Sequence, residues 1–177
     1  LYTAGLKIYT TVDSRMQQYA EEAVEEHLSN LQPEFNRRQK DNPTAPFLDI
    51  TPEETQKIMN QAMKNSERWR IMSINGKSDA EIKQSFEVPA KMKIFTWKGE
   101  RDTIMKPKDS ILYYKHFLQT GMMAMEPQTG HVKAWVGGIN YKYFQYDHVG
   151  QGARQVGSTF KPFVYATAID RLGKSPC

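Results

Sequence analysis

A serine and a lysine three residues apart form the most reactive pairing in the sequence. Ser158 and Lys161 lie in the run RQVGSTFKPF at residues 154–163, where the pattern predicts the start of a helix. Residues i and i+3 share one face of a helix, so the amine is within reach of the hydroxyl. A serine hydroxyl becomes a nucleophile when a base removes its proton. The spacing therefore predicts acyl transfer by Ser158 with Lys161 as its base.

A lysine must lose its own proton before it can act in this way. Lysine amines ordinarily have a pKa of about 10.4, and desolvation and the positive end of a helix both favour the neutral form. Backbone N–H groups at the start of a helix can stabilise an oxyanion, and Gly157 leaves room for a substrate beside the serine. We place the substrate and oxyanion region at Gly157, Thr159 and Tyr146. From the spacing alone a bland alternative stays open, in which the serine is an N-cap and the lysine is solvated.

The residues around this pair carry a family resemblance. The string RQxGSxFKPF resembles the active-site serine region of class A penicillin-binding proteins, the bifunctional peptidoglycan synthases. Residues 122–138 (MMAMEPQTGHVKAWVGG) resemble the hairpin that opens their transpeptidase domain, and residues 5–13 (GLKIYTTVD) resemble the segment that leaves their glycosyltransferase domain. The chain departs from the family at Val156, where many relatives have proline, and at residues 147–149, where an Asn-Arg-Ala-like run is common.

The resemblance implies a reaction, a substrate and a location. In the family, the serine attacks the D-Ala-D-Ala bond of a peptidoglycan stem peptide, an amino group of a neighbouring stem resolves the acyl-enzyme, and β-lactams acylate the same serine. Family members carry S-x-N and K-[ST]-G motifs after the serine, whereas here residues 73–75 match S-x-N before it and no K-[ST]-G occurs. We therefore expect a fragment, inactive by itself, of a membrane-anchored parent. The parent would act at the extracytoplasmic (periplasmic) face of the bacterial inner membrane, and any membrane contact would lie in its missing parts.

The predicted fold class is α+β with two parts. Residues 1–120 are expected to form a linker region of helices and short antiparallel strands, and residues 121–177 the truncated start of a transpeptidase domain with its hairpin and active-site helix. Two alternatives stay open. Residues 1–120 could be a non-catalytic module that docks cell-wall synthesis partners, which would present an exposed apolar patch on the helices of residues 51–85. The chain could also be a penicillin-sensing domain, although the leader resembling a glycosyltransferase exit favours a synthase.

Helix start signals define the first half of the chain. Asp13 should cap a helix over residues 14–28, followed by a polar, proline-containing loop at 32–49. Thr51 with Glu54 forms a capping box that should start a helix reaching Arg68. Ser78 with Glu81 repeats the signal for a short helix.

Hairpins and further helices fill the second half. Residues 92–97 and 101–105 should pair around Lys98-Gly99-Glu100, and Asp109 should cap a helix that ends before Gly121. A second hairpin at 122–136 should bury one face of its alternating strand. Pro162 lacks the N–H that would bond the Ser158 carbonyl, so the helix should begin irregularly. We expect residues 1–120 to be the stable part and residues 139–177 to be mobile or ordered by a neighbouring copy.

Composition excludes several other functions. The 177 residues carry a net charge of +4 with both signs interspersed, so nucleic-acid binding has little support. The single cysteine, Cys177, cannot staple the fold, and no cofactor is expected. The four histidines show no metal-ligand spacing, so no metal site is predicted.

Two groups of apolar side chains allow more than one interpretation. Methionines at helical spacing can fill a core or form a soft peptide groove; they are Met16, Met59, Met63 and Met72. An aromatic run can cover a sheet edge or line a cleft beside Ser158; it consists of Tyr141, Tyr143, Phe144 and Tyr146.

Overall fold

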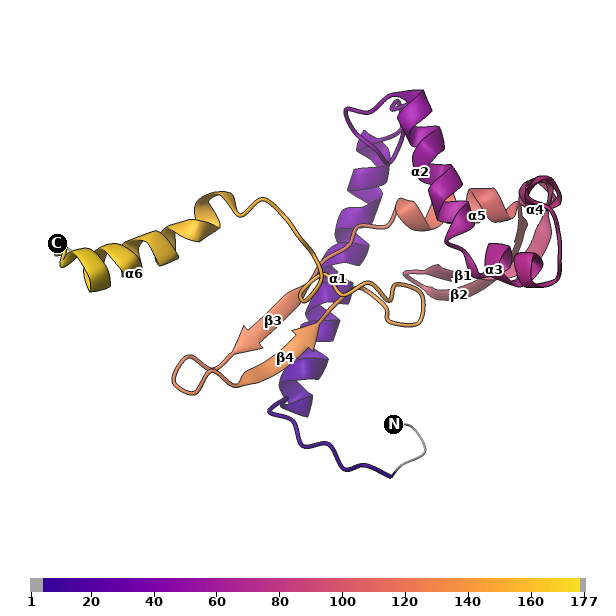
Figure 1. Ribbon diagram of the computed structural model, residues 1–177. Coiled ribbons are helices and arrows are strands. Elements are labelled where there is room, and N and C mark those ends of the chain that lie inside the picture. The colour runs from indigo at the N-terminus through magenta and orange to yellow at the C-terminus, as the bar shows by residue number, and fades with distance from the viewer. Residues whose placement is uncertain (1–4, 176–177) are drawn as a thin grey trace.

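The long first helix organises the molecule. The computed structural model describes residues 5–175, and in it α1 (Ser14–Arg38) runs through the centre with a hairpin beside its first half and a group of short helices around its second half (Figure 1). Asp13 caps α1 as predicted, since its carboxylate accepts the N–H groups of Arg15 and Met16 over 2.9 and 3.1 Å. The buried stripe of α1 includes Ala20, Val24 and Leu28.

The predicted end of this helix at residue 28 is wrong. The helix continues to Arg38, ten residues further than predicted, so Pro33, which was expected in the loop, lies inside the helix. The reason is a tertiary contact: the side chain of Gln32, only 5% exposed, donates to the His116 carbonyl over 2.8 Å and accepts the Leu118 N–H over 2.9 Å. These two bonds keep Gln32 in the helix, although the next residue, Pro33, weakens helices.

Three short helices form a second core. They are α2 (Pro52–Lys64), α3 (Glu67–Ile74) and α4 (Asp79–Ser85). The capping boxes predicted for α2 and α4 are both present. The predicted extension of α2 to Arg68 is wrong, because the Ser66 hydroxyl accepts the Trp69 N–H over 3.3 Å and starts α3. The core of this group consists of Met63, Trp69, Ile82 and Phe86.

The first predicted hairpin is confirmed, but its turn is not at residues 98–100 as predicted, because Gly99 and Glu100 already pair in the second strand. Strand β1 (Ala90–Thr96) pairs antiparallel with β2 (Gly99–Met105), and Thr96 lies opposite Gly99 across a two-residue turn. Helix α5 (Pro107–Lys115) follows. Its predicted cap is wrong: Lys106 takes the cap position without a side-chain hydrogen bond, and Asp109 lies in the first turn, because Pro107 suits the first helical position.

The second hairpin packs on α1. Strands β3 (Met122–Met125) and β4 (Val132–Val136) pair antiparallel with an irregularity between Ala124 and Met125. The predicted alternation in β4 is confirmed, since Ala134 and Val136 are buried against the stripe of α1. The fold is thus α+β, with two separate two-stranded sheets. The division at residue 120 stays a prediction; α1, from the first part, packs on β4, from the second.

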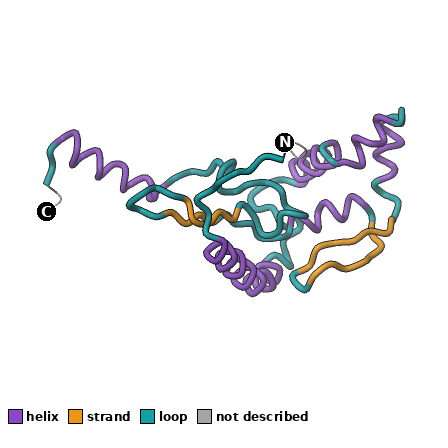
Figure 2. Tube along the Cα trace, turned by 90° about the horizontal axis from the view of Figure 1, so that it is seen from below, coloured by secondary structure: helices purple, strands orange, loops and turns teal. Residues whose placement is uncertain are grey.

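The C-terminal helix extends away from the rest of the molecule. A short 3-10 turn, η1 (Gly157–Phe160), leads into α6 (Lys161–Leu172), which projects to one side in both Figure 1 and Figure 2. Its large apolar side chains are exposed: Phe163, Val164, Tyr165, Ile169 and Leu172. Within residues 5–175, no helix combines the length and the apolar character needed to cross a membrane. Cys177 lies outside the described residues.

Candidate active site

The predicted nucleophile lies at the junction of η1 and α6. Ser158 is the second residue of η1 and Lys161 the first of α6. The backbone N–H of Lys161 donates to the carbonyl oxygen of Ser158. Pro162 has no N–H for the regular α-helical bond to that carbonyl. The predicted irregular start of the helix is therefore confirmed, and the 3-10 turn is its form.

The Ser158–Lys161 pair is exposed to solvent on its own helical turn. Ser158 and Lys161 are both exposed, and so are all the residues of η1. In the described part of the chain, no hydrogen bond joins the Ser158 hydroxyl to the Lys161 amine. The structure therefore places the two residues on one helical turn. The desolvation that a lysine base requires must come from other groups that pack against this turn.

The neighbours of the serine have defined backbone roles. Gly157 has a φ of 50°, in the left-handed region that favours glycine, and a Cβ there would meet no heavy atom within 4 Å. A glycine at this position thus suits the backbone of the turn and leaves open space beside the serine, as expected next to a nucleophile. The N–H of Thr159 donates to the Val156 carbonyl over 3.1 Å, and the Thr159 hydroxyl donates to the same oxygen. Both Thr159 donors are engaged in this arrangement, and its oxyanion role stays a prediction.

Tyr146 is tied to its own loop. Its hydroxyl donates to the Gln151 carbonyl over 2.8 Å, and its ring contacts His148 edge-on at 4.9 Å between centroids. No contact joins Tyr146 to Ser158 among the described residues. The structure thus brings Gly157, Ser158 and Lys161 together through the chain itself and leaves Tyr146 apart, so its substrate role stays a prediction.

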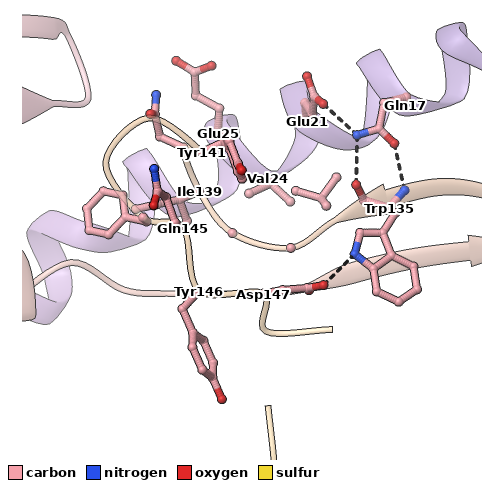
Figure 3. A pocket seen from close by; sticks show the side chains of 15 residues that line it. Gln17, Glu21, Val24, Glu25, Trp135, Ile139, Tyr141, Gln145, Tyr146 and Asp147 are labelled. Carbon is pink, nitrogen blue, oxygen red and sulfur yellow. Dashed lines mark hydrogen bonds between the residues drawn. The ribbon is translucent and has the colours of Figure 1, made fainter. Parts of the chain in front are cut away.

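Tyr146 instead borders a pocket between α1 and the end of β4. The pocket has a volume of about 470 Å³ and is closed on one side by the loop after β4 (Figure 3). Gln17 of α1 lines the pocket and is bonded to β4: its side chain donates to the Trp135 carbonyl over 3.0 Å and accepts the Trp135 N–H over 2.8 Å. Because Gln17 also donates to Glu21 over 2.7 Å, this wall of the pocket is fixed by hydrogen bonds.

A carboxylate shapes the loop beside this pocket. Asp147 accepts the N–H groups of Val149 and Gly150 over 2.9 and 3.0 Å, and the Trp135 indole N–H over 3.2 Å (Figure 3). These bonds, that of Gly150 first, hold the pKa of Asp147 below its usual value. A Cβ on Gly137 would lie 2.8 Å from the carboxylate, so the loop closes tightly around it. This role of Asp147 was not predicted from the sequence, although aspartate followed closely by glycine is typical of such turns.

The aromatic run has a role that neither alternative described. Tyr143 and Phe144 insert among Phe95, Tyr114 and Phe117, whereas Tyr141 is 82% exposed. Residues 139–152 are consequently packed within their own chain. The structure holds this stretch by contacts within its own chain, whereas the expectation that it is mobile or ordered by a neighbouring copy stays a prediction.

The remaining alternatives concern the helices of residues 51–85. Met59 and Met63 are buried, which supports the core interpretation for them, and Met16 is exposed. Ile71 and Ile74 of α3 are also exposed, but isolated apolar side chains are ordinary on a protein surface. In the described part of the chain no three His, Cys, Asp or Glu side chains are grouped to hold a metal ion.

Comparisons with known proteins match both parts of the chain. Residues 42–118 match the model of the penicillin-binding protein middle domain. The chain is 31% identical to penicillin-binding protein 1A of Rickettsia felis over 96% of this chain and 23% of that protein. It is 27% identical to penicillin-binding protein 1A of Neisseria flavescens over 95% of this chain, and 26% identical to that of Vibrio cholerae over 96%.

These alignments include the serine turn and the α1–β4 core as well as the middle domain. The chain spans about a quarter of the length of the curated relatives it matches. No solved structure matches the chain. The resemblance seen around Ser158 and the independent match of residues 42–118 lead to one family: the chain belongs to the class A penicillin-binding proteins and corresponds to a segment that contains their middle domain.

Proposed function

We propose that the chain is the part of a peptidoglycan synthase that contributes the nucleophile of a serine-type D-alanyl-D-alanine transpeptidase. One observation carries the proposal: Ser158 and Lys161 occupy a single turn, with the Lys161 N–H bonded to the Ser158 carbonyl, in a member of this family. The alternative of a capping serine is disfavoured, because Ser158 lies inside η1 and the cap positions of η1 and α6 are Val156 and Phe160.

The first half of the reaction forms an acyl-enzyme. The Ser158 oxygen attacks the carbonyl carbon of the penultimate D-alanine while the Lys161 amine takes the hydroxyl proton. The C–N bond to the terminal D-alanine then breaks, and the departing nitrogen receives that proton. The products are an ester on Ser158 and free D-alanine.

The second half transfers the peptide. An amino group of a neighbouring stem peptide attacks the ester carbon, the C–O bond to Ser158 breaks, and a proton returns to the serine oxygen. A β-lactam enters the first half alone: the serine opens the lactam C–N bond and keeps the acyl group. The partners are therefore stem peptides and β-lactams, with no nucleic acid and no cofactor. Further cell-wall synthesis proteins would bind through the linker region.

The proposed setting follows from where stem peptides occur. The parent protein would be membrane-anchored and act at the extracytoplasmic, periplasmic face of the inner membrane. Acylation would need the groups that pack around α6 in the full-length protein, since this chain alone leaves Ser158 and Lys161 exposed. We expect the isolated chain to be inactive.

Fluorescent penicillin tests the assignment. In the full-length protein that contains this chain, peptide mapping should locate the label on Ser158. Within the 177 residues of this chain, Ser158 is the only serine followed three residues later by lysine. Ser158→Ala should abolish labelling, and Ser110→Ala should leave it unchanged. Label on another serine would overturn the assignment. An acyl-enzyme that forms from a stem peptide but that no acceptor amine resolves would indicate a penicillin sensor instead of a transpeptidase.

A further inference from the structure

The loop that leads toward Ser158 is attached to the middle domain by an aromatic ring. We name residues 137–152 the anchor loop and the rings of Phe95, Tyr114 and Phe117 the aromatic socket. The Phe144 ring of the anchor loop lies 5.5, 5.7 and 5.6 Å from these three rings, between centroids. All three socket residues belong to the middle domain match at 42–118. The anchor loop thus packs, through Phe144, against the middle domain.

Hydrogen bonds join the strand and the helix that carry the socket. The N–H of Phe95 donates to the Tyr114 hydroxyl over 3.2 Å, and the Tyr113 hydroxyl donates to the Phe95 carbonyl over 2.7 Å. Strand β1 and helix α5 are therefore held in one alignment, and Phe95 is only 8% exposed. A socket built in this way offers one position for the incoming ring.

A charged contact holds the loop at a second point. Glu100 of β2 accepts hydrogen bonds from the Lys142 amine and, over 2.8 Å, from the Tyr143 hydroxyl. The amine of Lys93 lies 3.5 Å from its other oxygen. The bond from Lys142, followed by that from Tyr143, lowers the pKa of Glu100 to about 2, so the carboxylate is charged at neutral pH. The Tyr143 ring also stacks on Tyr114 at 6.0 Å.

Among the described residues, the segment between the anchor loop and the serine makes no tertiary hydrogen bond or ring contact. Asp147 closes the loop through its bonds to Trp135, Val149 and Gly150. Residues 153–157 are then exposed up to Ser158. In the described part of the chain, the anchor loop is therefore the last fixed point before the nucleophile.

We propose that the middle domain positions the nucleophile, because its aromatic socket and Glu100 fix the anchor loop from which the serine segment departs. This inference rests on the acyl transfer proposed above for Ser158. Phe144 and Glu100 are positioning residues, since they act through the loop and touch no reacting atom. Displacing a reacting group by about 1 Å can slow a reaction about 100-fold. Loosening the anchor should lower the saturating acylation rate and leave its pH profile unchanged, because Lys161 is untouched.

The experiment compares variants of the full-length protein that contains this chain. Acylation by fluorescent penicillin is followed at several concentrations, which separates the saturating rate from the half-saturating concentration. Phe144→Ala should lower the saturating rate about 10- to 100-fold, and Phe144→Leu, which refills the socket, should recover part of it. Glu100→Gln should lower it less. Asp102→Asn removes a charge from an exposed position of the same strand and should have no effect.

Hydrogen exchange of the same proteins reports on the anchor itself. Phe144→Ala should speed exchange in residues 137–152 and leave Ala20 and Val24 of the α1 core protected. Faster loop exchange with an unchanged acylation rate would overturn the positioning role while leaving the serine assignment intact. Unchanged exchange would overturn the anchor even if the wild-type protein proved not to react at Ser158. If Phe144→Ala fails to fold, Glu100→Gln decides both points, since it leaves the socket filled.

Discussion

The side-chain amide of Gln32 donates to the carbonyl oxygen of His116 over 2.8 Å, joining the middle of α1 to the end of α5 across 84 residues of sequence. Its oxygen accepts the N–H of Leu118 over 2.9 Å, so one buried amide satisfies two backbone groups of the same turn. This contact connects α1, which packs on β4, with the end of α5, the helix that contributes Tyr114 to the aromatic socket. Gln32 is thus a structural bridge between the two halves of the molecule.

Removing this bridge should destabilise the protein. Gln32→Leu leaves the His116 carbonyl and the Leu118 N–H without partners, which should lower the free energy of unfolding by about 2–4 kcal/mol. Urea unfolding measures the change. Gln18→Leu is the matched control, because Gln18 is exposed and bonds only Glu22, and it should change the value by less than about 0.5 kcal/mol. Equal effects for the two variants would show that the bridge contributes nothing.

The core of the short helices should depend on Ile82. This side chain is 0% exposed and packs with Met63, Trp69 and Phe86. Ile82→Ala should cost about 2–5 kcal/mol of unfolding free energy, and Ile82→Val about 0.5–1.5 kcal/mol. Ile74→Ala, on an exposed position of α3, is the control and should cost far less. A graded series is expected; a flat one would argue against a packed core here.

Acid should weaken the start of α4 through Glu81. The Ser78 backbone bond, with the Lys77 amine and the Ser78 hydroxyl, lowers the pKa of Glu81 from 4.5 to about 2. The unfolded chain therefore binds this proton more readily, so the stabilisation is complete above about pH 4.5 and is lost as the pH falls through about 2. Glu81→Gln should flatten the dependence of unfolding free energy on pH in that window. Glu53→Gln, outside either capping box, should leave the slope unchanged.

The role of Lys161 as a base makes a prediction that its charge alone does not. In the full-length protein, Lys161→Ala should slow penicillin acylation by about 10²- to 10⁴-fold, and Lys161→Arg should fail as well, because arginine does not give up its proton. Lys174→Ala removes a charge from the end of the same segment and should acylate normally. Circular dichroism checks that the folds agree. A fully active arginine variant would mean that only the positive charge matters.

Local chemistry explains which elements were predictable. The cap at Asp13, the capping boxes of α2 and α4 and both hairpins depend on residues close together in sequence, and all are confirmed. The errors have tertiary or competing local causes. The helix through Pro33 needs Gln32 to meet α5, and the break before α3 depends on Ser66 becoming a cap where a continuous helix was expected.

The candidate site divides in the same way. The spacing of Ser158 and Lys161 and the irregular turn before Pro162 follow from a few adjacent residues, so the sequence was sufficient for them. The insertion of Phe144 into the aromatic socket joins segments that no short-range pattern relates. A run of aromatic residues predicts that the rings are buried, but it does not indicate which residues they pack against.

The hydrogen bond from the Lys161 N–H to the Ser158 carbonyl has a mechanical meaning. Because this bond closes the turn between the two residues, the backbones of Ser158 and Lys161 move together when η1 and α6 tilt or slide as a unit. Docking then sets the rotamer of the long Lys161 side chain and the solvent and electric field that its amine experiences. The spacing of the two backbones is thus inherited from the turn, and burial of the pair favours the neutral amine that a base requires.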